Sequence, residues 1–250
     1  MDFAFTERRP TGRLGAVVES IWHARGQIPY ARERIAPTGS TVAGIVLGPP
    51  IRQTPAGGRS FLATSGFLIG PHDRPLINEP TGFTDCVGVV TTPVGCGAVL
   101  GMEPRPLRGR VVDLLGRPDA GSDVLLDRTE TALLAGLEEA DHGLPRCAAA
   151  VAALEADPNR PVSDVAAALG ISHGHLDRKF TRVVGLSPRT LARVLRVQRL
   201  LAALDVTDRI PWARLAADHG WYDQAHLVRD FTAAVGAPPA RYAEHGGRAR

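Results

Sequence analysis

The chain has 250 residues, enough for two ordinary domains, and 44% of them are hydrophobic, which excludes a disordered or fibrous protein. The net charge is only +3, but it is unevenly distributed: residues 150–250 hold 14 basic against 10 acidic side chains, and the first 149 residues hold 15 against 16. A basic half beside a neutral half is typical of a polyanion-binding module joined to a second domain.

The cysteine content and the hydropathy pattern indicate where such a protein works. Three scattered cysteines, Cys86, Cys96 and Cys147, are too few for a disulfide framework. The start MDFAFTERRP lacks the apolar run of a secretory signal. No stretch approaches the roughly 20 apolar residues that a membrane-spanning helix needs. We therefore expect a soluble, cytoplasmic protein that does not contact the membrane.

The first half of the chain has the pattern of a β-rich domain. Residues Leu14–Trp22 carry apolar side chains at helical spacing, which predicts a short helix before the strands. Short apolar runs bounded by Gly and Pro follow, and these predict β-strands. The runs are Thr41–Leu47, Phe61–Ile69, Cys86–Val90, Ala98–Leu100 and Val111–Leu115.

The second half has a helical pattern, beginning with the Ala- and Leu-rich segments Thr129–Glu139 and Arg146–Ala156. Further helices are predicted at about 162–169, 173–184, 188–204, 212–219, 223–234 and 239–244. The fold class is therefore α+β. We expect a β-rich regulatory or sensory domain over 1–127, a helix and linker over 128–144, and an all-α domain over 145–250.

An internal repeat is the most informative feature of the helical half. The first part of the repeat has an offset of 50 residues: it matches Pro161, Ala166 and Gly170 to Pro211, Ala216 and Gly220. The second part has an offset of 51 residues: it matches Leu176, Phe180, Gly185 and Pro188 to Leu227, Phe231, Gly236 and Pro239. Each copy predicts a helix, a tight turn made by a glycine with positive φ, and a second helix that packs inward through a leucine and a phenylalanine four residues apart. These are the requirements of a helix-turn-helix unit. Plain helical hairpins in an all-α core are the alternative.

The same residues resemble the AraC/XylS family of transcription regulators, whose DNA-binding module holds two helix-turn-helix units joined by a long helix. The first unit reads SDVAAALGISHGHLDRKFTRVVGLSP, the joining helix RTLARVLRVQRLLAAL, and the second unit ends in GWYDQAHLVRDFTAAVGAPPARY. The resemblance covers about residues 145–245. It implies that the two reading helices sit about 34 Å apart and enter successive major grooves on one face of the duplex.

The resemblance also assigns DNA contacts. Arg178, Arg229 and Gln224 are the predicted base readers, because Arg pairs with guanine and Gln with adenine. Lys179, Arg182 and Arg196 are predicted to hold phosphates. The remaining positions expected at the DNA surface are His173, Gly174, His175, Asp177, Thr181, Ala225, His226 and Val228. Gly174 offers no side chain and Asp177 repels phosphate, so the first unit is expected to read little sequence.

For the amino-terminal half, the resemblance implies a cupin-like sensory domain, carried here by RIAPTGSTVAGIVLG and SGFLIGPHDRPL. His72, Asp73 and the distant His23 do not make a metal-ligand set, so we expect no metal and no cofactor. Trp22, Tyr30, Arg32, Arg34, Phe67, His72 and Arg74 could line an effector pocket or serve as core and surface. Double-stranded DNA is the expected partner; RNA polymerase, a small-molecule effector and a second copy of the chain are candidates.

Two other classes of function compete with a regulator that is not an enzyme. A DNA-repair or other enzyme fused to a DNA-binding module needs an activated cysteine or a zinc site, and neither Cys86 nor Cys96 stands in such a context. These two cysteines could instead form a redox pair or be plain buried thiols. An interaction protein built from the same hairpins, without DNA binding, is the third class.

Overall fold

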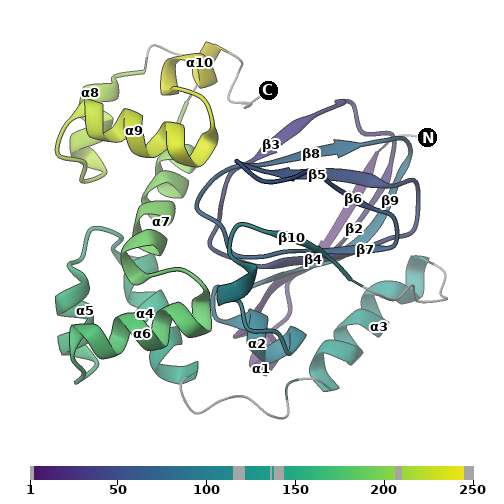
Figure 1. The fold of residues 1–250 in the computed structure, drawn as a ribbon, viewed down its shortest axis with the longest axis horizontal. Coiled ribbons are helices and arrows are strands. Elements are labelled where there is room, and N and C mark those ends of the chain that lie inside the picture. Colours follow the sequence, from purple (N-terminus) through teal and green to yellow (C-terminus); the bar gives the residue numbers. More distant parts are fainter. Residues whose placement is uncertain (1–2, 115–121, 136, 138–143, 206–209, 245–250) are drawn as a thin grey trace.

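The computed structural model describes residues 3–114, 122–135, 137, 144–205 and 210–244. Two antiparallel β-sheets form the amino-terminal part, and a group of helices forms the carboxy-terminal part beside it (Figure 1). The α+β class, with a β-rich region followed by an all-α region, is confirmed. The order of the two regions places every predicted DNA contact in the helical part.

The β-rich region is a sandwich of two sheets. The larger sheet has six strands in the order β1 (Ala4–Arg8), β2 (Val18–Gly26), β9 (Thr84–Thr91), β4 (Val42–Val46), β7 (Gly66–Ile69) and β10 (Val111–Asp113). The smaller sheet has the order β3 (Glu33–Ile35), β8 (Leu76–Pro80), β5 (Ile51–Pro55) and β6 (Phe61–Ala63). A buried cluster that includes Val46, Phe67 and Leu76 takes residues from strands of both sheets and forms the interior of the sandwich.

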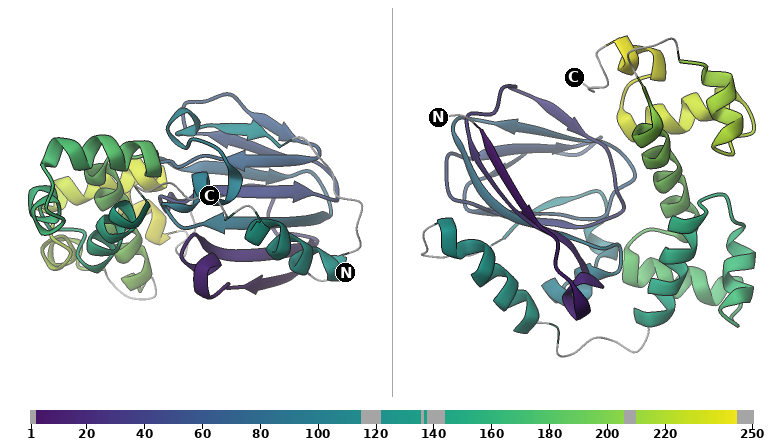
Figure 2. Two further views of the ribbon diagram at one scale, coloured as in Figure 1. Left: turned by 90° about the horizontal axis from the view of Figure 1, so that it is seen from below. Right: turned by 180° about the vertical axis from the view of Figure 1, so that it is seen from behind.

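Three helices cover the outer side of the larger sheet. They are α1 (Gly12–Gly15), α2 (Gly95–Leu100) and α3 (Ser122–Ala135), and a second buried cluster with Leu14, Ile21 and Leu133 lies beneath them. Arg8 of β1 also donates to Asp127 at 2.6 Å and to Glu130 at 3.0 Å on α3. The helix α3, predicted from residue 129, begins at Ser122, and its predicted end at Glu139 lies outside the described residues. This helix, teal in Figure 2, lies on the side of the sandwich away from the carboxy-terminal helices.

Two of the predicted elements of this region are wrong, and a third, Phe61–Ile69, is divided between two strands, β6 in the smaller sheet and β7 in the larger one. Leu14–Trp22 is not a helix: after the short α1 the chain enters strand β2. A register shift between Val18 and Ser20 interrupts the alternation of β2, and such a bulge gives a strand an apolar spacing that looks helical. Ala98–Leu100 belongs to helix α2 rather than to a strand, because so short an apolar run has no period of its own.

The helical region contains α4 (Leu144–Ala156), α5 (Val162–Ala168), α6 (His173–Val184), α7 (Pro188–Ala203), α8 (Trp212–Asp218), α9 (Gln224–Val235) and α10 (Pro239–Glu244). The predicted helices are confirmed to within two residues at each end. The helix α7 is 16 residues long, hence about 24 Å. It connects two helix pairs, one at each end (Figure 1).

The sandwich packs against α7 and the ends of α6 and α9. Val94 belongs to the same buried cluster as Leu176 and Phe180 of α6, so the two regions share core. Gln198 of α7 donates to the carbonyl of Pro37 at 2.6 Å, and Arg34 donates to the carbonyl of Gly236 at 3.0 Å. The β-rich region therefore contacts both helix pairs as well as the helix between them.

Candidate nucleic-acid interface

The first helix-turn-helix unit consists of α5 and α6. Gly170 ends the first helix with φ of +66°, a conformation that glycine adopts without strain. The side chain of Ser172 then caps α6 by accepting the backbone N–H of His175. Leu176 and Phe180 are fully buried, as the repeat predicts. This turn and this core fix the angle at which α6 leaves α5.

The second unit, α8 and α9, is built in the same way. Gly220 has φ of +81°, and Asp223 caps α9 by accepting the backbone N–H of His226 at 2.6 Å. Leu227 and Phe231 are fully buried. The Phe231 ring makes edge contacts with two aromatic rings, those of Trp212 and Tyr242, at centroid distances of 6.3 and 5.4 Å.

The joining helix α7 holds the two units together. Ser187 caps it by accepting the backbone N–H of Thr190, and Pro188 occupies its first turn. The apolar side chains of this helix lie on one face: Leu191, Val194, Val197 and Leu200 are buried, and Leu195 and Leu201 are half-buried.

The predicted DNA contacts lie at the surface of the helical region. Eight of the fourteen are exposed: His173, Gly174, Arg178, Lys179, Arg182, Gln224, Ala225 and Arg229. The other six are half-buried: His175, Asp177, Thr181, Arg196, His226 and Val228. The structure thus brings them together on two helices and the connector, although it does not test which of them touch DNA.

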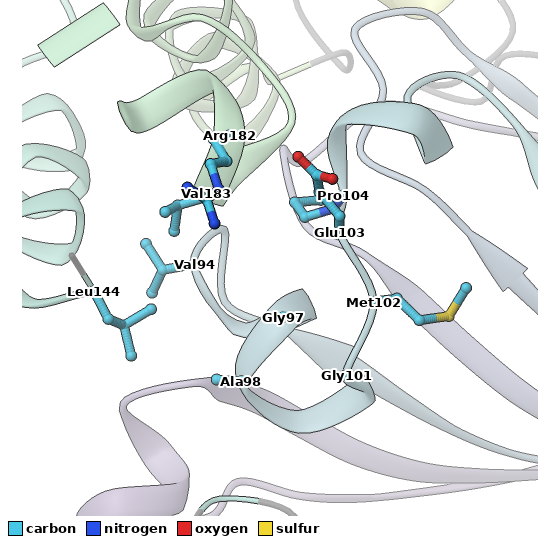
Figure 3. Close-up of a pocket in the computed structure, with 10 residues that line it drawn as sticks. All are labelled: Val94, Gly97, Ala98, Gly101, Met102, Glu103, Pro104, Leu144, Arg182 and Val183. Carbon is cyan, nitrogen blue, oxygen red and sulfur yellow. The ribbon is translucent and has the colours of Figure 1, made fainter. Parts of the chain in front are cut away.

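Three of these residues already have protein surroundings that bear on their roles. Arg182 lies near the end of α6, where it lines a cavity of about 250 Å³ opposite Glu103 of the β-rich region (Figure 3). His226 lies 3.4 Å from the carboxylate of Asp230. The guanidinium carbon of Arg196 lies 5.5 Å from the centre of the Trp221 ring, an arrangement that permits a cation–π interaction.

Arg196 is the least solvated of the predicted phosphate ligands. Burial lowers the pKa of its guanidinium, while the carboxylates of Asp230 and Asp157 raise it in part. Its Nε atom is buried and has no hydrogen-bond partner in the part of the chain that the structure describes. A positive charge in this state gains from an added anion more than a fully hydrated one does.

Two further arginines of α7 share the face of Arg196 and were not among the predicted DNA contacts. Arg189 and Arg193 lie four residues apart on the helix, and Arg196 follows three residues later on the same face. This spacing was visible in the sequence, so three cations on one face of the connector could have been predicted from it.

In the β-rich region, the residues proposed for an effector pocket are not gathered in one place. Phe67 is in the core, and Tyr30 donates to Glu33. His72 and Arg74 line one small hollow. His72 is buried; its Nδ1 donates to the carbonyl of Gly70 at 3.0 Å, and its Nε2 has no partner among the described residues.

The cysteines have the properties of buried thiols rather than reactive ones. All three are buried, and burial, together with the charge of Asp85, raises the pKa of the Cys86 thiol to about 12. Burial also raises the pKa of Cys96. A reactive cysteine needs the opposite shift. Among the described residues, no group of three or more metal-ligating side chains is found, and no helix is long and apolar enough to cross a membrane.

Comparison with solved structures gives several similar chains. ToxT from Vibrio cholerae is 11% identical, with 98% of each chain covered and a TM-score of 0.48. The carboxy-terminal domain of AraT from Geobacillus stearothermophilus is 20% identical over 42% of this chain and 88% of its own, with a TM-score of 0.38. An AraC-type regulator from Chromobacterium violaceum is 19% identical over 40% of this chain and 91% of its own, with a TM-score of 0.36. No curated protein matches the chain.

A family model described as a helix-turn-helix domain matches residues 148–245. The match spans both helix pairs and the connector between them, the same stretch in which the sequence repeat and the two capped turns lie. Residues 148–245 are therefore a helix-turn-helix domain, the kind of domain with which transcription regulators bind DNA.

Proposed function

We propose that the protein binds a specific duplex site by inserting α6 and α9 into successive major grooves. The observation that carries this proposal is the pair of capped helices at the two ends of one rigid connector, with the starts of both helices exposed. Residues in the first turns of a reading helix are the ones that reach base edges. The proposal includes a separation of about one turn of DNA between the two helices.

The second unit makes the sequence-specific contacts in this proposal. Its exposed face carries Gln224 and Arg229, whose side chains can each pair with two acceptor or donor atoms of one base. The first unit offers Arg178, but beside it stand Gly174, which has no side chain, and Asp177, which repels phosphate. We therefore assign positioning and limited reading to the first unit.

Lys179, Arg182 and Arg196 are assigned to backbone phosphates, which fix the register of the protein on DNA without reading sequence. The other predicted positions, His173, His175, Thr181, Ala225, His226 and Val228, would lie within the two interfaces. In this proposal the protein works in the cytoplasm on double-stranded DNA, as a regulator rather than as an enzyme.

The β-rich region is proposed to modulate DNA binding, because it contacts α6, α7 and the end of α9. A small molecule in the cavity beside Arg182 would touch both regions at once (Figure 3). RNA polymerase and a second copy of the chain are further partners that the proposal allows.

A selection of bound duplexes from a random library, followed by measured affinity for the selected site, tests the proposal. Replacement Arg229→Ala should cost about 1–3 kcal/mol for that site and relax the preference at one base pair. Arg214→Ala is the matched control, since Arg214 is an exposed arginine of the same unit that lies on α8 and pairs with Asp218. If both variants keep the affinity and the preference of the wild type, α9 does not read DNA.

A further inference from the structure

The connector α7 presents a positively charged face between the two reading helices. Arg189, Arg193 and Arg196 line a cavity of about 280 Å³, whose other walls include His226 and Asp230 of α9. Arg189 and Arg196 also line a hollow of about 530 Å³ together with His173 and Asp177 of α6. The arginine face is therefore flanked by the start of one reading helix and by residues of the other.

A duplex that occupies both units must pass this face. When two reading helices enter successive major grooves, the stretch of DNA between the grooves lies against the connector, and it presents phosphates rather than major-groove base edges. Arginines bind phosphates in a geometry of paired hydrogen bonds. Arg196, whose buried Nε lacks a partner among the described residues, places a third guanidinium beside these two cavities.

One arginine of this face is already held by a carboxylate. Arg193 donates through Nη2 to Oδ2 of Asp73 at 2.7 Å, and Arg108 of the β-rich region lies 3.3 Å from the same oxygen. The Arg193 side chain is 40% exposed and that of Asp73 17% exposed, so solvent screens this ion pair only in part.

The loop that carries Asp73 is seated on both units. A Cβ atom added to Gly185, at the end of α6, would stand 2.5 Å from Pro71, and one added to Gly236, at the end of α9, would stand 3.0 Å from Pro75. The five residues from Pro71 to Pro75 thus reach from the first unit to the second, with Asp73 midway on the connector. The docked β-rich region therefore places one negative charge at the edge of the arginine face.

We propose that the arginine face of α7 is a third DNA contact, which holds backbone phosphates between the two reading helices, and that Asp73 occupies Arg193 in place of a phosphate. Docking of the β-rich region and DNA binding then compete for one guanidinium. This proposal rests on the proposed function and extends it, because it assigns Arg189 and Arg193 to the interface and names the group that opposes them.

The test uses the full-length chain and a fluorescein-labelled duplex of random sequence, about three helical turns long. Its binding constant is measured by anisotropy over a range of salt concentrations, because each phosphate contact adds about 0.9 to the slope of log K against log salt. Asp73→Asn should tighten binding about two- to fivefold, the range expected for loss of one partly exposed ion pair, and should steepen the slope by up to about one. Arg189→Gln should make the slope shallower by about the same amount.

A double-mutant cycle separates competition from a general change in charge. In the Arg193→Gln background, Asp73→Asn should give no gain, because the connector arginine that it releases is gone and Arg108, the other arginine paired with Asp73, belongs to the β-rich region rather than to the arginine face. Asp113→Asn is the matched control: it removes one exposed carboxylate from β10 of the same region, without an ion pair to the helical region among those described, and should leave affinity and slope unchanged.

Four results would overturn the proposal. If Asp73→Asn and Asp113→Asn tighten binding equally, the gain is only a change in total charge. If the gain from Asp73→Asn persists without Arg193, the two side chains do not act together. If neither the wild type nor Asp73→Asn binds any duplex, the proposed function fails as well. If the wild type binds but Asp73→Asn and Arg189→Gln change neither the affinity nor the slope, this inference alone fails.

Discussion

The two helix-turn-helix units are alike in what shapes the backbone and different in what faces outward. Gly170 and Gly220 make the two turns, and Gly185 and Gly236 end the two second helices with φ of 80° and 79°. With the offset of 51, the outward residues differ at three positions, where the first helix has His173, Gly174 and Asp177 and the second has Gln224, Ala225 and Val228. One outward arginine is shared, as Arg178 and Arg229. The repeat therefore preserves the positions that only a few residue types can fill, while the reading surfaces differ at most positions other than this arginine.

The cores of the two units also differ in their surroundings. The first unit packs on α4 and shares its buried cluster with Val94 of the β-rich region. The second unit packs on aromatic rings of its own, those of Trp212, Trp221 and Tyr242. The first unit is therefore joined to the β-rich region through its core, whereas the second contacts that region mainly at its edge, through Arg34 and Pro75.

The largest expected effect comes from removing the phenylalanine at the centre of each unit. Phe180→Ala and Phe231→Ala should each cost about 3–5 kcal/mol of unfolding free energy, because both rings are fully buried. Phe231→Ala should cost about 1 kcal/mol more, since that ring also loses two edge contacts with aromatic neighbours. Urea unfolding followed by circular dichroism measures both. A larger cost at Phe180 would show that contact with the β-rich region stabilises the first unit more than aromatic contacts stabilise the second.

The turn glycines should show a smaller and unequal effect. Gly170→Ala meets open space and should cost about 1–2 kcal/mol for the positive φ alone. At Gly220 the new Cβ would stand 2.4 Å from the side chain of Asn159, whose amide donates to the carbonyl of His219. Gly220→Ala should therefore cost about 1 kcal/mol more than Gly170→Ala, because that hydrogen bond must move.

Substitution by asparagine controls for the strain at these turns, since asparagine tolerates positive φ better than alanine does. Gly170→Asn should recover part of the stability lost in Gly170→Ala, and Gly220→Asn should recover less because the steric conflict with Asn159 remains. Equal costs at the two glycines would mean that the Asn159 contact is not maintained in solution.

The sequence predicted the helical region better than the β-rich region for a physical reason. In the helical region, glycines at fixed offsets and buried pairs four residues apart act locally, so each helix can be recognised from its own residues. In the β-rich region, whether a strand forms depends on its neighbours. The bulge between Val18 and Ser20 gave β2 an apolar spacing like that of a helix. The strands β1, β3, β5 and β8 lack the long apolar runs that identify a buried strand.

The candidate interface was predictable in part. The helices and turns that carry the reading residues followed from the repeat, and the residues proposed on them lie at the surface. The partners of those residues did not follow, because they come from distant parts of the chain. The pairing of Asp73 with Arg193 joins residues 120 positions apart, and no local pattern in the sequence indicates it.

The smallest effect in this comparison concerns the residues that cap the reading helices. Asp223 accepts the N–H of His226 at 2.6 Å, and Ser172 accepts that of His175 at 3.3 Å. Replacement by alanine should cost about 1 kcal/mol at either site. The cost should be larger for Asp223, because its negative charge also interacts with the positive end of the helix dipole. Asp223→Asn retains the acceptor and removes the charge, so the difference in unfolding free energy between the Asn and Ala variants isolates the hydrogen bond.

The variant Ser172→Asp tests whether the first unit lacks only the charge. If it raises the unfolding free energy by a few tenths of a kcal/mol, the weaker cap reflects the choice of residue in the first unit. If it lowers the unfolding free energy, Asp177, five residues further along the same helix, already supplies the negative charge there.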